Sequence, residues 1–374
     1  MKRKSLIALL LAATVAATSM LPADALAAPT STKTKKTKKP AKKAAAPASD
    51  YYTGEFVNYN QWKEVQQFAG DMVAKHGFSR AELDSLFSNV RYLDSVVQLV
   101  KPAPPGKPKN WSVYSSRFIE PIRVNAGVRF WNENADALAR AEALYGVPAE
   151  TLVGLIGVET IYGRDTGRFR VVDTLTTLAF AYPLAPNREA RMAFFRDELE
   201  ATLLYARQAG IDPLSLQGSF AGAVGMPQFM PSNILKYAVD FDGDGRIDLR
   251  NSAADAIGSV AAFLVGHGWH REQPGALVYP ATVSPSRAWE TYLTGGLEAK
   301  FRPEDLTAAG VVTTSPLPPG MLYGLVDLQN GSEPTEYWVA SNNFYAITQY
   351  NRSYFYAMSV VELGRAVRLS RGAN

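Results

Sequence analysis

Glu150-Thr-Leu-Val-Gly-Leu-Ile-Gly-Val-Glu159-Thr-Ile-Tyr-Gly163 is apolar on nearly every face of a helix. We therefore expect a buried helix at the centre of a mainly helical core. Glu159 is its only acid after the first turn. Desolvation raises the pKa of a buried carboxyl group, which is the property that a general acid needs at neutral pH. On spacing alone, a core glutamate bonded to a backbone or hydroxyl partner is an equally good interpretation.

A second segment, Ser219-Phe-Ala-Gly222-Ala-Val-Gly225-Met-Pro-Gln228-Phe-Met-Pro-Ser232, combines glycines with neutral polar residues. Its glycines permit a close approach of the backbone to a ligand. Ser219, Gln228 and Ser232 offer hydrogen-bonding groups that suit sugar hydroxyls and amides. A buried turn explains this pattern equally well.

A third segment, Asn342-Asn-Phe-Tyr-Ala-Ile-Thr-Gln-Tyr350-Asn351-Arg-Ser-Tyr-Phe-Tyr356, is rich in aromatic and amide side chains. Such a mixture suits the stacking of sugars and the recognition of their amides. Aromatic residues at helical spacing are, however, more often part of a hydrophobic core.

The remaining composition excludes several kinds of catalytic site. The chain has three histidines and no cysteine, so it has no thiolate nucleophile and no Cys-ligated metal. It also lacks the His-Glu-x-x-His metal motif and the Gly-x-Ser-x-Gly nucleophile motif. Carboxylates remain as the candidates for catalysis, and no catalytic cofactor is expected.

Together the three segments resemble the B-type lytic murein transglycosylases, glycoside hydrolases of bacterial envelopes, over roughly residues 57–370. The motifs Gly-Val-Glu-Thr-x-Tyr-Gly, Gly-Met-Pro-Gln-Phe-Met-Pro-Ser and Asn-Phe-Tyr-x-Ile-Thr-x-Tyr-Asn-x-Ser carry this resemblance. It implies an α+β, mainly α fold, with a lysozyme-like catalytic core, a helical front domain and a small β insert.

The resemblance also implies roles for individual residues. Glu159 matches the catalytic acid/base of the family, and the positions that match its glycan cleft are Tyr114, Arg191, Ser219, Gln228, Tyr350, Asn351 and Tyr356. The family usually has an arginine pair where this chain has Ala190 and Arg191. Ala190 therefore lacks the guanidinium group of the first arginine.

The implied reaction cleaves the bond between N-acetylmuramic acid and N-acetylglucosamine and leaves 1,6-anhydromuramyl ends. The implied partners are peptidoglycan glycan strands and other cell-wall enzymes. Two alternatives stay open. A hydrolytic muramidase needs a second carboxylate in the cleft, for which Asp165 and Asp173 are candidates. The other alternative is a non-catalytic scaffold that binds peptidoglycan.

Residues 240–251 resemble an EF-hand calcium loop. The ligands expected for a structural calcium ion are Asp240, Asp242, Asp244, Arg246 through its carbonyl group, and Asp248. Asn251 replaces the usual glutamate at the twelfth position. By the family resemblance Asp255 closes the site, although a helix cap by Ser252 and Asp255 is an alternative.

The N-terminal residues indicate export. Three basic residues precede an apolar run that ends in Ala25-Leu26-Ala27, which predicts a signal peptide over residues 1–27. The run is too short for a membrane span, and no cysteine is available for lipidation. We therefore expect a soluble periplasmic protein without stable membrane insertion.

Charge divides the chain unevenly. Residues 1–50 hold ten of the 39 Lys and Arg and two of the 35 Asp and Glu, a net charge of +8, which leaves −4 for residues 51–374. An acidic body argues against nucleic-acid binding. Residues 28–50 are rich in Lys, Ala and Pro and are expected to form a disordered linker.

These signals divide the chain into successive segments. After the signal peptide and linker we expect a helical front domain (51–145), a catalytic core with the EF-hand-like loop (146–274), a small β domain (275–340) and a C-terminal segment that completes the core (341–374).

Overall fold

The computed structural model describes residues 58–101 and 108–373. The predicted signal peptide and linker therefore lie outside the described residues, as does most of the Pro-rich segment at 101–108. The predicted fold class is confirmed, because the chain is mostly helical with small antiparallel sheets.

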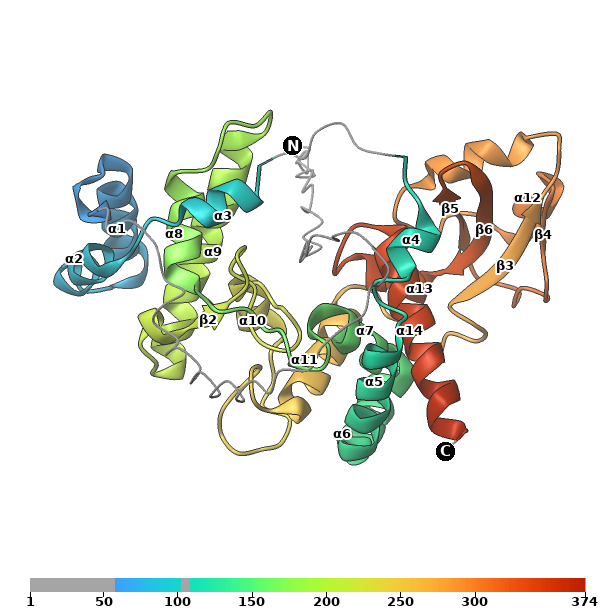
Figure 1. Cartoon of the computed structure of the whole chain (residues 1–374), viewed down its shortest axis with the longest axis horizontal. Coiled ribbons are helices and arrows are strands. Elements are labelled where there is room, and N and C mark those ends of the chain that lie inside the picture. Colours follow the sequence, from blue (N-terminus) through green and yellow to red (C-terminus); the bar gives the residue numbers. More distant parts are fainter. Residues whose placement is uncertain (1–57, 102–107, 374) are drawn as a thin grey trace, which may run out of the picture.

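The first helices lie at one end of the molecule (Figure 1). They are the short η2 (Tyr59–Gln61), α1 (Lys63–His76), α2 (Arg80–Asn89) and α3 (Asp94–Leu99). Helices α1 and α2 are separate, because Gly77 ends α1 with φ of 65° and the Ser79 hydroxyl caps the N-terminus of α2. Helix α3 packs against α8 (Val171–Phe180), which in turn packs against the long α9 (Arg188–Ala209).

The centre of the molecule is built around α7 (Ala149–Thr160), whose residues 151–158 are all buried. It contacts α5 (Pro121–Glu133), α6 (Ala135–Tyr145), α11 (Ala253–Gly266) and α14 (Tyr354–Gly372). Glycines allow the closest of these contacts. A Cβ atom at Gly154 would overlap with the carbonyl oxygen of Val360, and one at Gly364 with that of Glu150. The backbones of α7 and α14 therefore touch directly.

The remaining helices of the central part are short. They are α4 (Trp111–Ser115), α10 (Pro231–Tyr237) and α13 (Asn342–Thr348). Two small strands, β1 (Phe169–Arg170) and β2 (Gln217–Gly218), pair antiparallel beside them. Buried side chains from Tyr59 to Val367 form one connected core.

The predicted small sheet is present at the opposite end of the molecule from α1 (Figure 1). Its antiparallel order is β4 (Val311–Thr313), β3 (Val278–Val283), β6 (Glu333–Ser341) and β5 (Tyr323–Asn330). With η4 (Ala288–Gly295) and α12 (Pro303–Ala308) it encloses a second core around Trp289, Leu306 and Tyr323.

The helices of the predicted front domain (51–145) pack in two separate places. Helices α1 to α3 lie beside α8 and α9, whereas α5 and α6 pack on α7. The boundaries of the predicted domains stay predictions.

Within residues 58–101 and 108–373, no single helix is long and apolar enough to cross a membrane. The pair α6 and α7 meets that test only when both are taken together, by length and composition, and the two are bent by 116°.

We expect Gly154→Ala to lower the free energy of unfolding by about 1–3 kcal/mol, as overpacking usually does. The added methyl group would overlap with the backbone of α14. Gly70→Ala is the matched control, because its methyl group meets nothing within 4 Å in α1 and helix propensity favours alanine by roughly 0.5–1 kcal/mol. Urea denaturation measures both. Equal stability of Gly154→Ala and the parent would contradict the close packing of α7 on α14.

Candidate active site

Glu159 is the penultimate residue of α7, and its side chain is half-buried, whereas residues 151–158 before it are buried. The hydroxyl of Tyr356, from the first turn of α14, donates a hydrogen bond to Oε1 of Glu159. Tyr356 is itself only 3% exposed. The acid predicted from the sequence therefore has a phenol as its partner.

Burial raises the pKa of Glu159 to about 7, although the hydrogen bond from Tyr356 opposes this rise. Both protonation states are thus populated near neutral pH. Burial, together with the charge of Glu159, also raises the pKa of Tyr350 and of Tyr356 well above 10. The two phenols stay protonated, and Tyr356 remains a donor.

Aromatic side chains form the surroundings of this pair. The rings of Tyr350 and Tyr356 are stacked, with centroids 6.4 Å apart and planes 15° from parallel. The Tyr350 hydroxyl donates to the carbonyl oxygen of Pro227. Burial and the charge of Glu159 raise the pKa of Tyr114 to about 12, which places this tyrosine within electrostatic range of the carboxyl group. Tyr114, Tyr350 and Tyr356, which come from two segments distant in sequence from α7, therefore surround Glu159.

Gln228 is held in a left-handed conformation with φ of 51°. Its Nε2 donates both hydrogens to backbone oxygens, one to Gly225 at 2.9 Å and one to Thr166 at 3.3 Å. The amide oxygen Oε1 is the group that remains for an external donor.

Ser219 is engaged within its own turn. Its hydroxyl oxygen accepts hydrogen bonds from the backbone N–H groups of Ala221 and Ala223, at 3.3 and 3.0 Å. The hydroxyl hydrogen is left to donate elsewhere.

Ser232 differs from what the sequence suggested. Its hydroxyl donates to Glu198 at 2.7 Å, and its N–H donates to the same carboxyl group at 2.9 Å. Glu198 is 4% exposed, and burial raises its pKa. Ser232 therefore binds Glu198 at the N-terminus of α10, and its hydroxyl hydrogen is not available to a ligand. Glu198 is not predicted from the sequence, because nothing local on α9 marks it and its partner lies 34 residues away.

The other two predicted cleft residues, Asn351 and Arg191, lie in different surroundings. Asn351 has a buried Oδ1 atom without a hydrogen-bond partner among the described residues, directly after Tyr350. Arg191 is half-buried in the first turn of α9. None of the hydrogen bonds within residues 58–101 and 108–373 joins it to the group around Glu159.

The two acids considered as a second cleft carboxylate lie in different surroundings. Asp173 is fully buried and forms an ion pair with Arg170 at 2.7 Å, and it also accepts from the backbone of Arg91. Asp165 is exposed. Of the described groups, only Tyr356 acts on the pKa of Glu159 besides burial.

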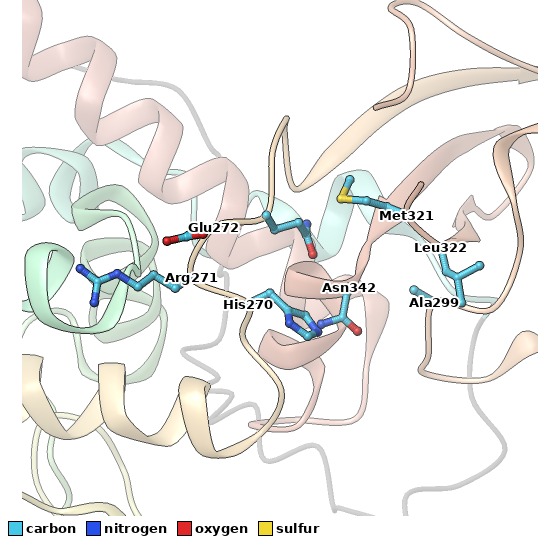
Figure 2. Close-up of a pocket in the computed structure, with 8 residues that line it drawn as sticks. His270, Arg271, Glu272, Ala299, Met321, Leu322 and Asn342 are labelled. Carbon is cyan, nitrogen blue, oxygen red and sulfur yellow. The ribbon is translucent and has the colours of Figure 1, made fainter. Parts of the chain in front are cut away.

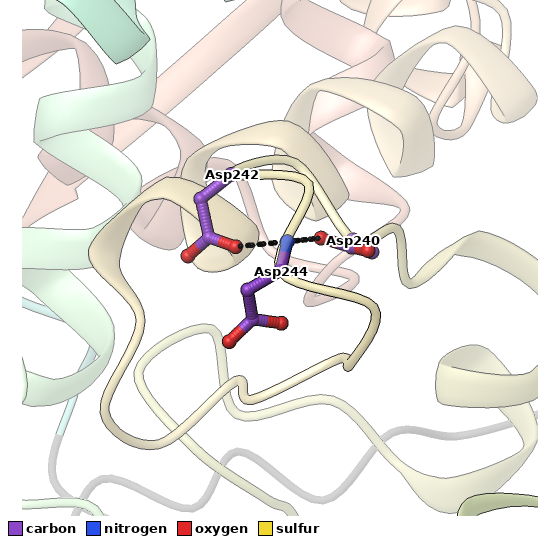
Figure 3. Close-up of side chains that lie close together, drawn as sticks. All are labelled: Asp240, Asp242 and Asp244. Carbon is purple, nitrogen blue, oxygen red and sulfur yellow. Dashed lines mark hydrogen bonds between the residues drawn. The ribbon is translucent and has the colours of Figure 1, made fainter.

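The predicted metal loop brings together three of its acids. Ligand atoms of Asp240, Asp242 and Asp244 lie within 4.8 Å of one another (Figure 3). Backbone N–H groups of Gly243 and Gly245 donate to Asp240, which folds the loop around this carboxylate. Gly245 has φ of 88°, so the sharp turn at the sixth position is also present. Three close oxygen donors fit a calcium ion.

Asp248 and Asp255 are engaged differently. Asp248 accepts from the backbone of Arg250 and Asn251. Asp255 is 1% exposed and accepts from the N–H groups of Phe241, Asp242 and Asp248, while its own N–H donates to the Ser252 hydroxyl. Both acids therefore shape the loop, and neither belongs to the three-acid cluster. Arg246 follows that cluster, and its N–H donates to Asp244.

The chain matches a known protein family over most of its length. Residues 60–365 match the family described as transglycosylase SLT domain. The membrane-bound lytic murein transglycosylase B of Escherichia coli K12 is 43% identical over 327 residues, which cover 85% of each chain. This chain belongs to the lytic transglycosylase family. The resemblance drawn from the sequence motifs is confirmed.

Solved structures of family members agree with the fold. The soluble lytic transglycosylase SltB1 from Pseudomonas aeruginosa has a TM-score of 0.75 at 43% identity, and the match covers 83% of this chain and 99% of that one. The E. coli lytic transglycosylase Slt35 in complex with calcium has a TM-score of 0.75 at 41% identity, covering 87% and 99%.

A separate cavity of about 640 Å³ lies between the loop after α11 and the β strands. His270 and Asn342 line one side of it, and Met321 and Leu322 line the other (Figure 2). None of the residues that line this cavity is among those that surround Glu159. The cavity is therefore distinct from the group around Glu159.

We expect Tyr356→Phe to raise the pKa of Glu159, because the lost hydrogen bond stabilises the carboxylate form. An NMR titration of the Glu159 carboxyl carbon measures this change. Tyr354→Phe is the matched control on the same helix, since its hydroxyl donates to Gly296 instead, and it leaves the titration unchanged. A Glu159 pKa that stays the same or falls in Tyr356→Phe would contradict the bond.

Proposed function

We propose that this lytic transglycosylase cleaves the β-1,4 bond between N-acetylmuramic acid and N-acetylglucosamine in peptidoglycan and leaves 1,6-anhydromuramyl ends. Glu159 is its single acid/base. The observation that carries this proposal is a carboxyl group with a pKa of about 7, bonded to a phenol that stays protonated. Such a group can give up and regain a proton at neutral pH.

The reaction uses Glu159 twice. The protonated carboxyl group donates its proton to the glycosidic oxygen while the bond from that oxygen to the muramyl C1 breaks. The carboxylate then takes the proton of the muramyl C6 hydroxyl as O6 attacks C1 and closes the anhydro ring. Glu159 ends protonated, as it began, and no water is consumed.

Two features of the surroundings favour different protonation states of Glu159. Burial favours the neutral acid that starts the reaction, whereas the hydrogen bond from Tyr356 favours the carboxylate that forms during it. Tyr356 therefore holds the carboxylate in place at the moment when it must accept a proton. This role requires no titration of the phenol itself.

We assign the glycan contacts to groups that the protein leaves available. Oε1 of Gln228 and Oδ1 of Asn351 accept from sugar hydroxyl or amide groups. The hydroxyl of Ser219 donates, and the rings of Tyr114 and Tyr350 cover the sugars. Arg191 is proposed to contact the strand further from the reacting bond.

The hydrolytic alternative has less support. A muramidase needs a second carboxylate to activate water, but Asp173 is occupied by Arg170 and Asp165 is exposed. The scaffold alternative does not explain why a carboxyl group with a raised pKa is retained beside a buried phenol donor. Product analysis separates the three.

We also propose a structural calcium ion at the acidic loop. Asp240, Asp242 and Asp244 supply carboxylate oxygens, and the backbone carbonyl group of Arg246 is a further ligand. Asp248 and Asp255 take part by holding the loop backbone. The relative Slt35, which has been solved with calcium, supports this assignment.

Activity on peptidoglycan requires a location outside the cytoplasmic membrane, so we propose a periplasmic enzyme exported by residues 1–27. Its partners are the glycan strands and, through them, other cell-wall enzymes.

We expect Glu159→Gln to lower the cleavage rate by at least about 100-fold to 10,000-fold, because the amide has no proton to exchange. Glycan binding survives, since the side chain keeps its shape. Glu150→Gln is the matched control, because Glu150 is the other acid of α7 and pairs with Arg368 at the opposite end of the helix. Rates on isolated sacculi measure the effect.

Mass spectrometry of the parent enzyme's products tests the reaction itself. Anhydromuramyl ends are lighter by one water than hydrolytic ends. Reducing ends would identify a muramidase, and a Glu159→Gln protein as fast as the parent would exclude Glu159 as the acid/base.

We expect calcium to raise the melting temperature of the parent, because an ion that binds only the folded state stabilises it by mass action. The double variant Asp240→Ala, Asp244→Ala loses this response. Asp71→Ala, which removes an exposed acid of α1, retains it. A parent that melts at the same temperature with calcium and with a chelator would contradict the site.

A further inference from the structure

Helix α7 ends in an unusual turn directly after Glu159. Ile161, Tyr162 and Gly163 follow one another with φ of 51°, 56° and 86°. Two of these three residues are not glycine, and Ile161 is β-branched, for which a positive φ is strongly disfavoured. Such a turn persists only where its surroundings hold it.

One group that holds the turn is Thr160, which is fully buried. Its hydroxyl donates to the carbonyl oxygen of Met226 at 2.9 Å and accepts from the N–H of Gly163 at 3.0 Å. This links the end of α7 to the Gly-Met-Pro-Gln segment. These bonds fix the backbone on one side of the turn only.

The side chain of Tyr162 holds the other side. A Cβ atom at either Gly127 of α5 or Gly157 of α7 would overlap with the phenol end of this side chain. The same two positions also lie against Val367 and Leu363 of α14. The ring therefore occupies the junction of α5, α7 and α14, in space that two glycines leave open, and two of those helices supply Glu159 and Tyr356.

The hydroxyl of Tyr162 gains little from this position. It is buried and has no hydrogen-bond partner among the described residues. Leaving a buried hydroxyl unpaired is unfavourable. Packing of the ring, with Phe130 at 5.0 Å between centroids, must therefore account for its placement.

We propose that Tyr162 is a positioning residue for Glu159. Its ring locks the left-handed turn at the end of α7 and so fixes the carboxyl group of Glu159 against the hydroxyl of Tyr356. The last turn of a helix frays unless it is anchored, and Glu159 lies in that turn. The inference rests on the proposed function of Glu159 as the acid/base.

The test compares two substitutions at one position. Tyr162→Leu removes the ring and is expected to lower kcat by about 100-fold, the scale of a misplacement of about 1 Å, while the Kd for an N-acetylglucosamine tetramer stays at the parent value. Tyr162→Phe keeps the ring and loses only the unpaired hydroxyl, so it keeps the parent kcat. Gly127→Ala leaves the sequence of α7 unchanged but displaces the Tyr162 ring, and also the Val367 side chain of α14, from α5, and it is expected to act like Tyr162→Leu.

A control separates positioning from general destabilisation. Leu138→Ala opens a cavity in α6, where Leu138 is fully buried, and lowers the melting temperature without disturbing the turn, so it keeps kcat at temperatures where it is folded. A second readout is the pKa of Glu159 in the pH profile of kcat/KM, which moves in Tyr162→Leu and not in Leu138→Ala.

The outcomes are distinct. Parent-like kcat in both Tyr162→Leu and Gly127→Ala would overturn the proposal, as would a loss in Leu138→Ala equal to that in Tyr162→Leu. Loss of kcat in Tyr162→Phe would also overturn it, because the hydroxyl would then be needed. If Glu159→Gln were fully active, the proposed function would fail instead, whatever the Tyr162 variants do.

Discussion

The contact on which this molecule depends is the hydrogen bond from Tyr356 to Glu159, between residues 197 positions apart. It requires α7 and α14 to lie in backbone contact, which Gly154 and Gly364 allow. The same close packing removes water from the carboxyl group and raises its pKa. The packing of one helix pair therefore sets both the hydrogen bond of Glu159 and its pKa.

The polar residues of the site serve the protein as well as a substrate. Gln228 donates its two amide hydrogens to the backbone of a strained loop. Only its amide oxygen is therefore left to accept a hydrogen bond from a ligand. Ser219 likewise accepts from its own turn. Such double use preorganises the cleft, because each side chain is already fixed before a ligand arrives. Ser232 is likewise engaged within the protein, because the buried carboxyl group of Glu198 accepts from both its hydroxyl and its N–H.

The acids of the loop at residues 240–251 and Asp255 also have two kinds of structural role. Asp240, Asp242 and Asp244 project together, and their mutual repulsion is relieved only in part by backbone N–H groups. Asp255 lies buried below them and ties three N–H groups of the loop to the start of α11. The spacing of acids along the chain predicts Asp240, Asp242 and Asp244 as ligands together with Asp248, and the family resemblance adds Asp255. The tertiary structure decides which of them lie in the three-acid cluster and which accept hydrogen bonds from the loop backbone instead.

Much of this protein was determined by the sequence itself. The continuous apolar faces around Glu159 specify a buried helix, since only burial satisfies such a surface, and the sequence also predicts a small β domain over residues 275–340. The tertiary structure alone decided the rest. It joined Tyr356 to Glu159, assigned Glu198 to Ser232 and placed the Tyr162 ring between Gly127 and Gly157. No local pattern encodes these contacts, because each depends on how helices distant in sequence pack together.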